Sequence, residues 1–326
     1  MKAAILGAGF IAEFHALGYQ QSTDASLCAV CDVDEEKARA LAERYRCAWY
    51  TDAGTLLEKE KPDLVSVCLP TYLHREYVCM ALSSGAHVLC EKPFALTLED
   101  CLAMQTAAEA ASRVLMVGQV LRWWPEYTVI AKEIRRLGTP LYLRARRLQH
   151  PSRDSWHAVK ELGGGALYDL FVHDMDFILS LLGTDAQVIC ANGSRGGGGS
   201  WRRVSATLRF PGGAVAEIEA CNQMPAGYPF TAELCAQYPG AAIDYRFRTA
   251  VNIERGAKAD TTFLLYDEGA VHALPLGEGA QEKAFIAQIG AFVQGAKAGI
   301  SPLPASESVR VMQVIDRVRQ MLEAQE

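Results

Sequence analysis

The feature that most constrains this chain is a glycine motif placed directly after its first apolar run. Residues 3–6 are short and apolar, as in a buried parallel strand, and they lead into Gly7-x-Gly9-x-x-Ala12. A helical pattern of apolar residues continues beyond the motif. Strand, glycine turn and helix in this order predict a site where the N–H groups of a helix N-terminus hold the pyrophosphate of a dinucleotide. The helix would begin at Phe10 and Ile11, next to the phosphates.

The glycine positions have separate roles in such a turn. Gly7 permits the tight turn, Gly9 lets the phosphates approach the backbone, and Ala12 keeps the helix close to the strand. The alternative is a tight turn in a protein that binds no dinucleotide. An acidic residue after the second strand argues against that alternative.

Asp32 follows the apolar stretch 26–31 and lies 25 residues after Gly7, close to the spacing of about 20 in dinucleotide-binding proteins. A carboxylate here accepts hydrogen bonds from the ribose hydroxyls and repels a 2′-phosphate. Val33 follows it, without an adjacent Arg or Lys. The sequence therefore predicts NAD in preference to NADP. Either Asp32 or Asp34 could instead cap the helix predicted over 35–45, and Asp34 is the better placed of the two.

Strands and helices alternate through the first third of the chain, which predicts a doubly wound parallel sheet of the Rossmann type. Further strand-like runs lie at 64–69, 87–90 and 114–117. Ligands of such sheets bind at the carboxyl ends of the strands. Residues at predicted strand ends, which should line one crevice, are Gly7, Asp32, Pro70, Thr71, Lys92 and Gln119.

Alternating strands dominate after about residue 182 and predict a large, mainly antiparallel open sheet in a C-terminal α+β domain. Gly-rich hairpin loops are expected at 195–200 and 211–213. A helix over 167–182 or a partner subunit would cover the sheet. We expect an NAD-binding domain over 1–120 and a substrate and oligomerisation domain over 121–326. The last helix, 306–323, would pack back on the first domain.

Composition excludes several other classes of protein. The net charge of the 326 residues is −6, with no basic tract for nucleic acid and no apolar run of about 20 residues for a membrane span. Arg144, Arg146 and Arg147 alternate with apolar residues, as in a strand with one solvated face. The ten cysteines are scattered, which is typical of reduced thiols in a cytoplasmic protein, and no metal site is predicted.

Six motifs in order over the first ~185 residues resemble the Gfo/Idh/MocA oxidoreductases, the family of glucose–fructose oxidoreductase and inositol dehydrogenase. These motifs are Gly7-Ala-Gly9-Phe-Ile-Ala12, Pro70-Thr-Tyr-Leu-His74, Glu91-Lys92-Pro93, Arg122 with Pro125 and Tyr127, Gly163-Gly-Gly-Ala-Leu-Tyr-Asp169, and His173-Asp-Met-Asp176. The resemblance implies NAD(P)-dependent hydride transfer to or from a sugar, a polyol or a related hydroxy or keto compound. It also implies a homodimer or homotetramer formed through the C-terminal sheet.

The same chemistry can be argued from the residues. Hydride transfer from an alcohol requires a base for the hydroxyl proton and a cation or donor beside the oxygen. Asp169 and His173 are four residues apart on a predicted helix and share a face. The resemblance implies that Lys92 binds the reacting oxygen, that His173 exchanges its proton and that Asp169 assists. Alone, each would be read as an ordinary surface residue.

Other residues are assigned to the cofactor or to the substrate. Cofactor contacts are expected from Pro70, Thr71, His74, Glu91, Lys92 and Gln119, with a helix-starting structural role as the alternative for His74. Substrate contacts are expected from Lys92, Arg122, Trp156, His157, Asp169 and His173. Two other functions remain open: a glycosidase that uses NAD in a transient oxidation, and a non-catalytic sensor that binds the dinucleotide.

Overall fold

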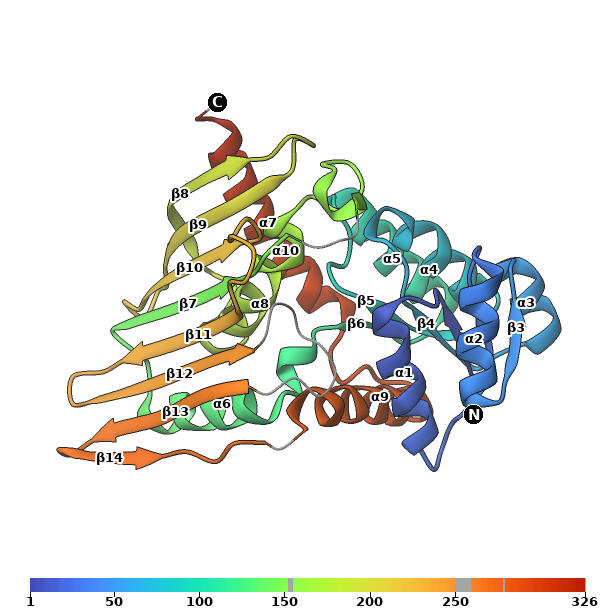
Figure 1. Ribbon diagram of the computed structural model, residues 1–326, viewed down its shortest axis with the longest axis horizontal. Coiled ribbons are helices and arrows are strands. Elements are labelled where there is room, and N and C mark those ends of the chain that lie inside the picture. Colours follow the sequence, from blue (N-terminus) through green and yellow to red (C-terminus); the bar gives the residue numbers. More distant parts are fainter. Residues whose placement is uncertain (152–154, 250–258, 278, 326) are drawn as a thin grey trace. The chain divides into compact units, whose positions relative to one another are not determined.

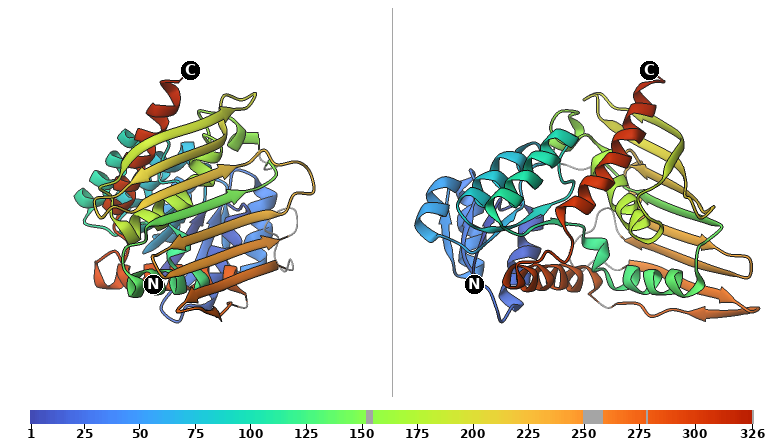
Figure 2. Two further views of the ribbon diagram at one scale, coloured as in Figure 1. Left: turned by 90° about the vertical axis from the view of Figure 1, so that its left-hand side faces the viewer. Right: turned by 180° about the vertical axis from the view of Figure 1, so that it is seen from behind.

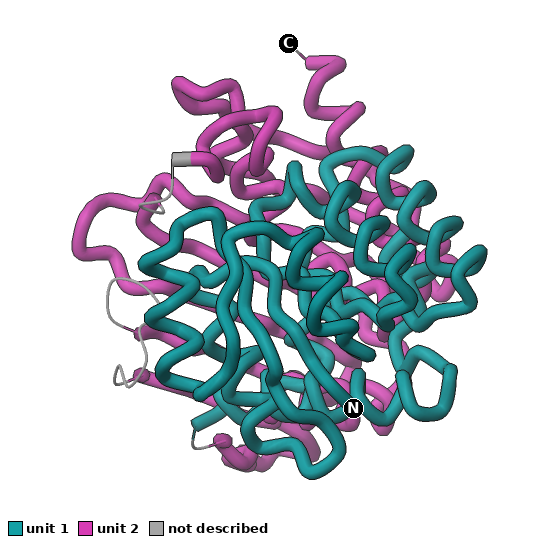
Figure 3. Tube along the Cα trace, turned by 90° about the vertical axis from the view of Figure 1, so that its right-hand side faces the viewer, with its two compact units in different colours: residues 1–124, 279–309 teal, residues 125–278, 310–326 magenta. Residues whose placement is uncertain are grey.

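The computed structural model (Figure 1) describes residues 1–151, 155–249, 259–277 and 279–325. The chain divides into two compact units, drawn in different colours in Figure 3. The first unit contains Met1–Trp124 and Gly279–Val309, and the second contains Pro125–Glu278 and Arg310–Glu326. Each unit has its own sheet.

The first unit is built on a six-stranded parallel sheet in the order β3-β2-β1-β4-β5-β6. Its strands are β1 (Lys2–Leu6), β2 (Ser26–Cys31), β3 (Ala48–Tyr50), β4 (Leu64–Val67), β5 (His87–Glu91) and β6 (Leu115–Gly118). Its helices are α1 (Phe10–Gln21), α2 (Glu35–Tyr45), α3 (Ala53–Glu60), α4 (His74–Ser83), α5 (Leu98–Ala111) and α9 (Ala280–Ala298), with short 3₁₀ turns η1 (Thr71–Leu73) and η2 (Val120–Arg122). The sequence prediction of a doubly wound parallel sheet is confirmed.

The strand order places the motifs in one row. All strand pairs of this sheet are parallel, so the carboxyl ends of β2, β1, β4, β5 and β6 lie side by side at one edge. The residues that follow these ends include Gly7, Asp32, Lys92 and Gln119. The central strands β1 and β4 are buried except at Lys2, as expected for a parallel sheet covered on both faces.

The turn after β1 requires glycine at position 7. Its φ is +98°, in the region that L side chains rarely adopt, and a Cβ there would lie 2.3 Å from the carbonyl oxygen of Cys68. Any larger residue would push the β1 turn away from the end of β4. The glycine therefore fixes how closely two neighbouring strand ends approach.

The second unit carries an eight-stranded sheet in the order β14-β13-β12-β11-β7-β10-β9-β8, seen in Figure 2. Its strands are β7 (Tyr142–Leu148), β8 (Gln187–Arg195), β9 (Trp201–Arg209), β10 (Val215–Cys221), β11 (Phe230–Gln237), β12 (Ala241–Thr249), β13 (Ala259–Asp267) and β14 (Ala270–Ala273). Its helical segments are α6 (Pro125–Leu137), η3 (Ser155–Ala158), α7 (Ala166–Asp169), α8 (Phe171–Leu182) and most of α10 (Ala305–Glu323). Only β7 and β10 pair in parallel, so the sheet is mainly antiparallel as predicted.

The two faces of this sheet differ in polarity. Inward side chains of β9 and β10, such as Leu208 and Ile218, are buried, and α8 packs on β7 and β10. The expected cover by the helix is thus present, and the hairpins at 195–200 and 211–213 join antiparallel strands. The other face carries an ion-pair ladder in which Arg146 contacts Glu219 at 2.8 Å and Glu233 at 3.3 Å.

The packing of the helix over 306–323 on the first domain stays a prediction; the first unit includes the start of α10, up to Val309. Helix α9 packs on α1: the rings of Phe14 and Phe285 stack at 4.9 Å, and Ile289 lies against Gly18. The contact requires glycine, since a Cβ at Gly18 would lie 2.6 Å from the Ile289 side chain. Helix α10 belongs to the second unit from Arg310 onward. Both helices have apolar stripes, so the sequence pattern could not tell their partners apart.

Within the described residues, no helix is both long and apolar enough to cross a membrane.

Candidate active site

The N-terminus of α1 is open, as a phosphate site requires. Gly9 is its N-cap residue and supplies no side-chain cap, and a Cβ built at Gly9 would meet nothing within 4 Å. Phe10 begins the helix with its side chain 57% exposed. No side chain caps the start of this 12-residue helix, which carries the positive end of the helix dipole, and of its first N–H groups that of Ala12 donates to the carbonyl of Gly9 at 3.1 Å. The positive φ of Gly7 is the tight turn that the sequence predicts, and the approach of phosphates at Gly9 stays a prediction.

Asp32 is tied to the same turn. One carboxylate oxygen accepts a hydrogen bond from the N–H of Ala8 at 2.7 Å, and the other accepts from the N–H of Asp34 at 2.9 Å. The helix α2 is capped by Asp34, whose carboxylate accepts from the N–H of Lys37. Asp34 therefore does the capping, and the Asp32 carboxylate is held at the edge of the glycine turn.

Lys92 directly follows β5 and is half-buried. The preceding residue, Glu91, is only 6% exposed and pairs with the ring of His15 at 2.9 Å. Its second oxygen accepts a hydrogen bond from the backbone N–H of Lys92 at 3.2 Å. Both Glu91 oxygens are thus engaged within the protein, and His15 is a residue that the sequence motifs did not single out. The available signal in the sequence was Glu91, an acidic residue at the end of an apolar strand and directly before Lys92.

His74 begins α4, in agreement with the structural alternative, and its ring is fully buried. Nδ1 lies 3.0 Å from the carbonyl oxygen of Pro93 and 3.2 Å from that of Phe94, and Nε2 lies 2.9 Å from that of Leu69. Both ring nitrogens therefore face backbone of the first unit. Burial lowers the pKa of His74, and the nearby carbonyls oppose that shift without outweighing it.

This lowered pKa predicts acid sensitivity. A histidine that binds protons less readily when folded contributes stability above its ordinary pKa of 6.5, and this contribution is lost as the pH falls toward the folded pKa. We expect the free energy of unfolding to decline below pH 6.5 by up to about 1.4 kcal/mol per pH unit for this group. Urea unfolding of the protein and of His74→Asn between pH 7.5 and 5 measures it: the decline should be shallower in the variant. Parallel curves would contradict the assignment to His74.

The remaining predicted residues of the first unit are mostly covered. Thr71 lies in η1 and is 4% exposed, and Gln119 is 2% exposed. Arg122 lies at the end of η2, with a guanidinium nitrogen 3.7 Å from a carboxylate oxygen of Glu307. Pro70 leads into η1, directly after the strand end of β4. Of these, Pro70 and Arg122 are half-buried and the other two are buried.

In the second unit, Trp156 and His157 lie in η3 with their rings stacked at 3.5 Å between centroids. The following glycines allow close packing. A Cβ at Gly163 would lie 2.7 Å from the His157 Cα, and a Cβ at Gly165 would lie 2.2 Å from the carbonyl oxygen of Trp201. The triple glycine therefore brings η3 and β9 against the start of α7.

Asp169 and His173 do not lie on one continuous helix, in contrast to the expectation of a single helix over 167–182. Helix α7 ends at Asp169 and α8 begins at Phe171, with Leu170 between them. The backbone stays in the right-handed helical region at Leu170, so the chain continues in nearly the same direction. Between residues 163 and 179, every residue except Asp169 and His173 is buried. Asp169 and His173 are thus the two half-buried residues of an otherwise buried segment.

Arg147 corrects the interpretation of the arginine cluster on β7. Arg144 is exposed, but Arg147 shares the inward face with Leu143 and Ala145 and is 6% exposed. Its guanidinium contacts both carboxylate oxygens of Asp174 on α8, at 2.8 and 3.1 Å, and donates to the Tyr127 hydroxyl at 3.0 Å. Strict alternation along β7 was the signal that could have found this residue.

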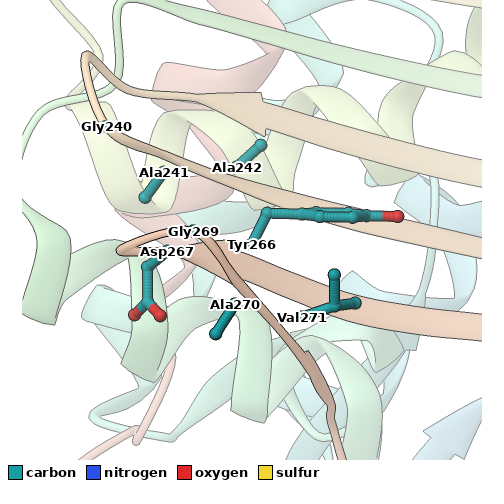
Figure 4. A pocket seen from close by; sticks show the side chains of 8 residues that line it. All are labelled: Gly240, Ala241, Ala242, Tyr266, Asp267, Gly269, Ala270 and Val271. Atoms are coloured by element: carbon teal, nitrogen blue, oxygen red, sulfur yellow. The ribbon is translucent and has the colours of Figure 1, made fainter.

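An open hollow on the second unit, shown in Figure 4, offers no comparable chemistry. It lies between the turn joining β11 to β12 and the turn joining β13 to β14, and only Tyr266 and Asp267 among its lining residues have polar side chains. The Asp267 carboxylate is paired with His272 at 2.9 Å. The catalytic candidates are elsewhere.

Comparison with known proteins agrees with this arrangement of motifs. Residues 1–119 match a family model described as "Oxidoreductase family, NAD-binding Rossmann fold", and residues 132–242 match the "GFO/IDH/MocA C-terminal domain".

Individual relatives resemble different lengths of the chain. D-glucoside 3-dehydrogenase of Escherichia coli is 36% identical over 193 residues, 57% of this chain and 55% of that protein. The 1,5-anhydro-D-fructose reductase of Ensifer adhaerens is 31% identical over 222 residues, 65% of this chain and 67% of its own. The matched region thus spans about half to two thirds of these relatives.

A solved structure extends the likeness of fold to the whole chain. The UDP-N-acetylglucosamine 3-dehydrogenase of Acidithiobacillus ferrooxidans superposes with a TM-score of 0.82 at 24% identity and covers 99% of this chain and 98% of its own. The two domain matches, the relatives and this fold lead to one conclusion: the chain belongs to the Gfo/Idh/MocA oxidoreductase family.

Proposed function

We propose that this protein is an NAD-dependent oxidoreductase that transfers a hydride between the nicotinamide and a sugar, a polyol or a related hydroxy or keto compound. The observation that carries the proposal is the row of strand ends in the first unit. An open helix N-terminus at Gly9, an anchored carboxylate at Asp32 and a lysine at position 92 all lie at that edge. Folding alone would not require an open helix N-terminus, an anchored carboxylate and a lysine at the same edge of the sheet.

The residues at this edge fit a dinucleotide. The space above Gly9 and the uncapped N–H groups of α1 suit a pyrophosphate, and the Asp32 carboxylate suits ribose hydroxyls. Pro70, Thr71, Glu91 and Gln119 would complete the surroundings, Glu91 through the backbone it fixes. When bound, NAD supplies a hydride acceptor.

The chain itself supplies the proton chemistry. In the proposal the Lys92 ammonium donates a hydrogen bond to the reacting oxygen and stabilises its developing negative charge. The neutral imidazole of His173 takes the hydroxyl proton as the C–H bond breaks, and returns it in the reverse direction. Asp169 orients the imidazole. The accessibility of Asp169 and His173 within a buried segment supports these roles.

The names of the relatives support the substrate class. A glucoside dehydrogenase and an anhydro-fructose reductase both act on polyhydroxylated rings. The stacked pair Trp156 and His157 combines an aromatic surface with a polar nitrogen, which suits such rings. Arg122 is a further candidate for hydroxyl recognition, since its side chain is not fully covered.

The direct test is an absorbance screen for NADH production. The purified protein is supplied with NAD, and separately with NADP, and with inositols, aldoses, alkyl glucosides, sugar acids and amino sugars. We expect NADH in proportion to product for at least one group. Product without net NADH would instead indicate the transient-oxidation glycosidase. NAD binding without any product across the panel would favour a phosphorylated or nucleotide-linked substrate, the glycosidase or the sensor.

Asp32 should set the choice of cofactor. Replacement of Asp32 by alanine removes the acceptor for the ribose hydroxyls and the repulsion of a 2′-phosphate. We expect the NAD-to-NADP ratio of kcat/KM to fall roughly 10- to 100-fold, the loss of one charge-assisted interaction. The control is Asp34→Ala, which removes the cap of α2 and should leave the ratio unchanged. An unchanged ratio in Asp32→Ala would contradict the NAD preference.

We also propose that the protein assembles as a homodimer or homotetramer through the charged face of the eight-stranded sheet. Its ladder around Glu219 includes Arg146 and Arg203, so like surfaces of two copies can pair opposite charges. Light scattering coupled to gel filtration should give a mass of two or four chains. A mass of one chain would contradict the proposal.

A further inference from the structure

Two buried histidines contact the residues directly before and after Lys92. His15 comes from α1 and contacts Glu91, the residue before the lysine. His74 comes from α4 and contacts the carbonyl of Pro93, the residue after it. Both rings are fully buried. The backbone that carries Lys92 is therefore held from two helices.

We propose that His15 and His74 are positioning residues that fix Lys92 for its role at the reacting oxygen. This inference rests on the function proposed above for Lys92. Neither histidine has access to a ligand, because both rings are enclosed by protein. They act through the residues on each side of the lysine.

The contact between His15 and Glu91 is held in place by several neighbours of the Glu91 carboxylate. The Glu91 oxygen that faces His15 at 2.9 Å also faces Gly118 of the neighbouring strand β6, where a Cβ would lie only 2.6 Å away. The other Glu91 oxygen accepts from the N–H of Lys92. A carboxylate with so little room has one orientation. Because α1 begins at the glycine turn, this contact also connects the phosphate end of the site to Lys92.

The His74 side connects two strand ends. The ring lies between the carbonyl of Leu69, just before Pro70, and the carbonyls of Pro93 and Phe94. Phe94 is itself fully buried, which anchors the far side of the turn. The neutral ring donates to a carbonyl on one side and packs against the carbonyl on the other, so it spans the separation between the end of β4 and the turn after β5. The position of the lysine backbone relative to the cofactor edge follows from that separation.

Each histidine is replaced by leucine, which removes both ring nitrogens, or by an amide residue, which restores one donor. His15→Leu and His74→Leu remove the ring contacts, while His15→Gln and His74→Asn restore a donor near Nε2 and Nδ1, respectively. The matched control is His87→Leu. His87 lies at the opposite end of β5, and its Nδ1 accepts from the backbone N–H of Val114 at 2.9 Å. It therefore loses a histidine–backbone contact in the same strand, away from Lys92.

The first readout requires no substrate. Trace acetylation with acetic anhydride, followed by peptide mass spectrometry, measures the reactivity of Lys92 relative to the exposed Lys59 on α3. We expect both leucine variants to raise the relative labelling of Lys92 several-fold, the Gln and Asn variants to reverse most of that rise, and His87→Leu to leave it unchanged.

The second readout separates positioning from binding. Using NADH fluorescence and the most active compound of the screen, we expect kcat to fall roughly 10- to 100-fold in the leucine variants. The dissociation constant for NADH should stay within about threefold, which follows if the phosphate site is intact. Partial recovery of kcat is expected in the Gln and Asn variants.

The outcomes distinguish the two proposals. If Lys92→Ala abolishes turnover but the leucine variants match His87→Leu in both readouts, the positioning role is wrong and the function stands. If Lys92→Ala retains turnover, the proposed function of Lys92 is wrong, while the labelling still reports whether the histidines fix it. A rise in Lys92 labelling that Gln and Asn do not reverse would indicate general loosening and overturn the positioning role.

Discussion

Replacement of Lys92 by alanine is expected to lower kcat by roughly 10²- to 10³-fold, the effect of removing one donor to a developing oxyanion. Lys92 is half-buried and directly follows β5, so its removal leaves the parallel sheet intact. The midpoint of urea unfolding should therefore change little, and the dissociation constant for NADH should rise by much less than kcat falls. Steady-state NADH production, with these two measurements, provides the test.

The control and the double variant make this prediction specific. Lys59→Ala removes the same charge from an exposed position on α3 and should leave kcat unchanged. If Lys92 and His173 act on the same oxygen and its proton, the double alanine variant should lose much less than the product of the two single losses. Full turnover in Lys92→Ala, or simple multiplication of the two losses, would contradict the shared mechanism.

The largest effect on stability is expected at the buried pair of Arg147 and Asp174. Replacement of Arg147 by methionine leaves the Asp174 carboxylate, 1% exposed, without its bidentate partner. An uncompensated charge in such a position costs about 3–5 kcal/mol of unfolding free energy. Chemical unfolding followed by circular dichroism measures this loss, and the transition should be assigned to the second unit, which contains both residues.

Two further variants test the physical reason for that loss. Arg146→Met changes the neighbouring residue of β7 on the opposite, more accessible face and should cost clearly less. Arg147→Met combined with Asp174→Leu removes both charges, and we expect it to recover much of the lost stability. Equal losses in Arg146→Met and Arg147→Met would show that burial of the pair is not the cause.

Helix α8 also carries His173, next to Asp174. The ion pair joins β7 to α8, and the Tyr127 hydroxyl adds α6 to the same contact. Its disruption should therefore lower activity at temperatures where the second unit is partly unfolded, and not through the chemistry itself. Activity per folded molecule separates the two effects.

Local patterns in the sequence were sufficient for the parallel sheet, the glycine turn and the helix caps. Gly7 is identified by the motif because few residues can adopt its positive φ, and Asp34 is identified as a cap because its position before a helix leaves few alternatives. The order of the six motifs along the chain was also sufficient to identify the family. Each of these depends on neighbours within a few residues or on a fixed strand–turn–helix unit.

Only the tertiary structure decided which distant residues meet. His15 and Glu91 are 76 residues apart, and Arg147 and Asp174 are 27 apart, so no periodicity records either contact. The same holds for the helix that packs on α1, since an apolar stripe predicts a buried face and not the element that covers it. Hydrophobic burial specifies that a face must be covered, but complementary shape and charge decide by what, as Gly18 does for Ile289. The sequence thus determined the chemistry available to this protein, and packing between distant segments determined which groups hold it in place.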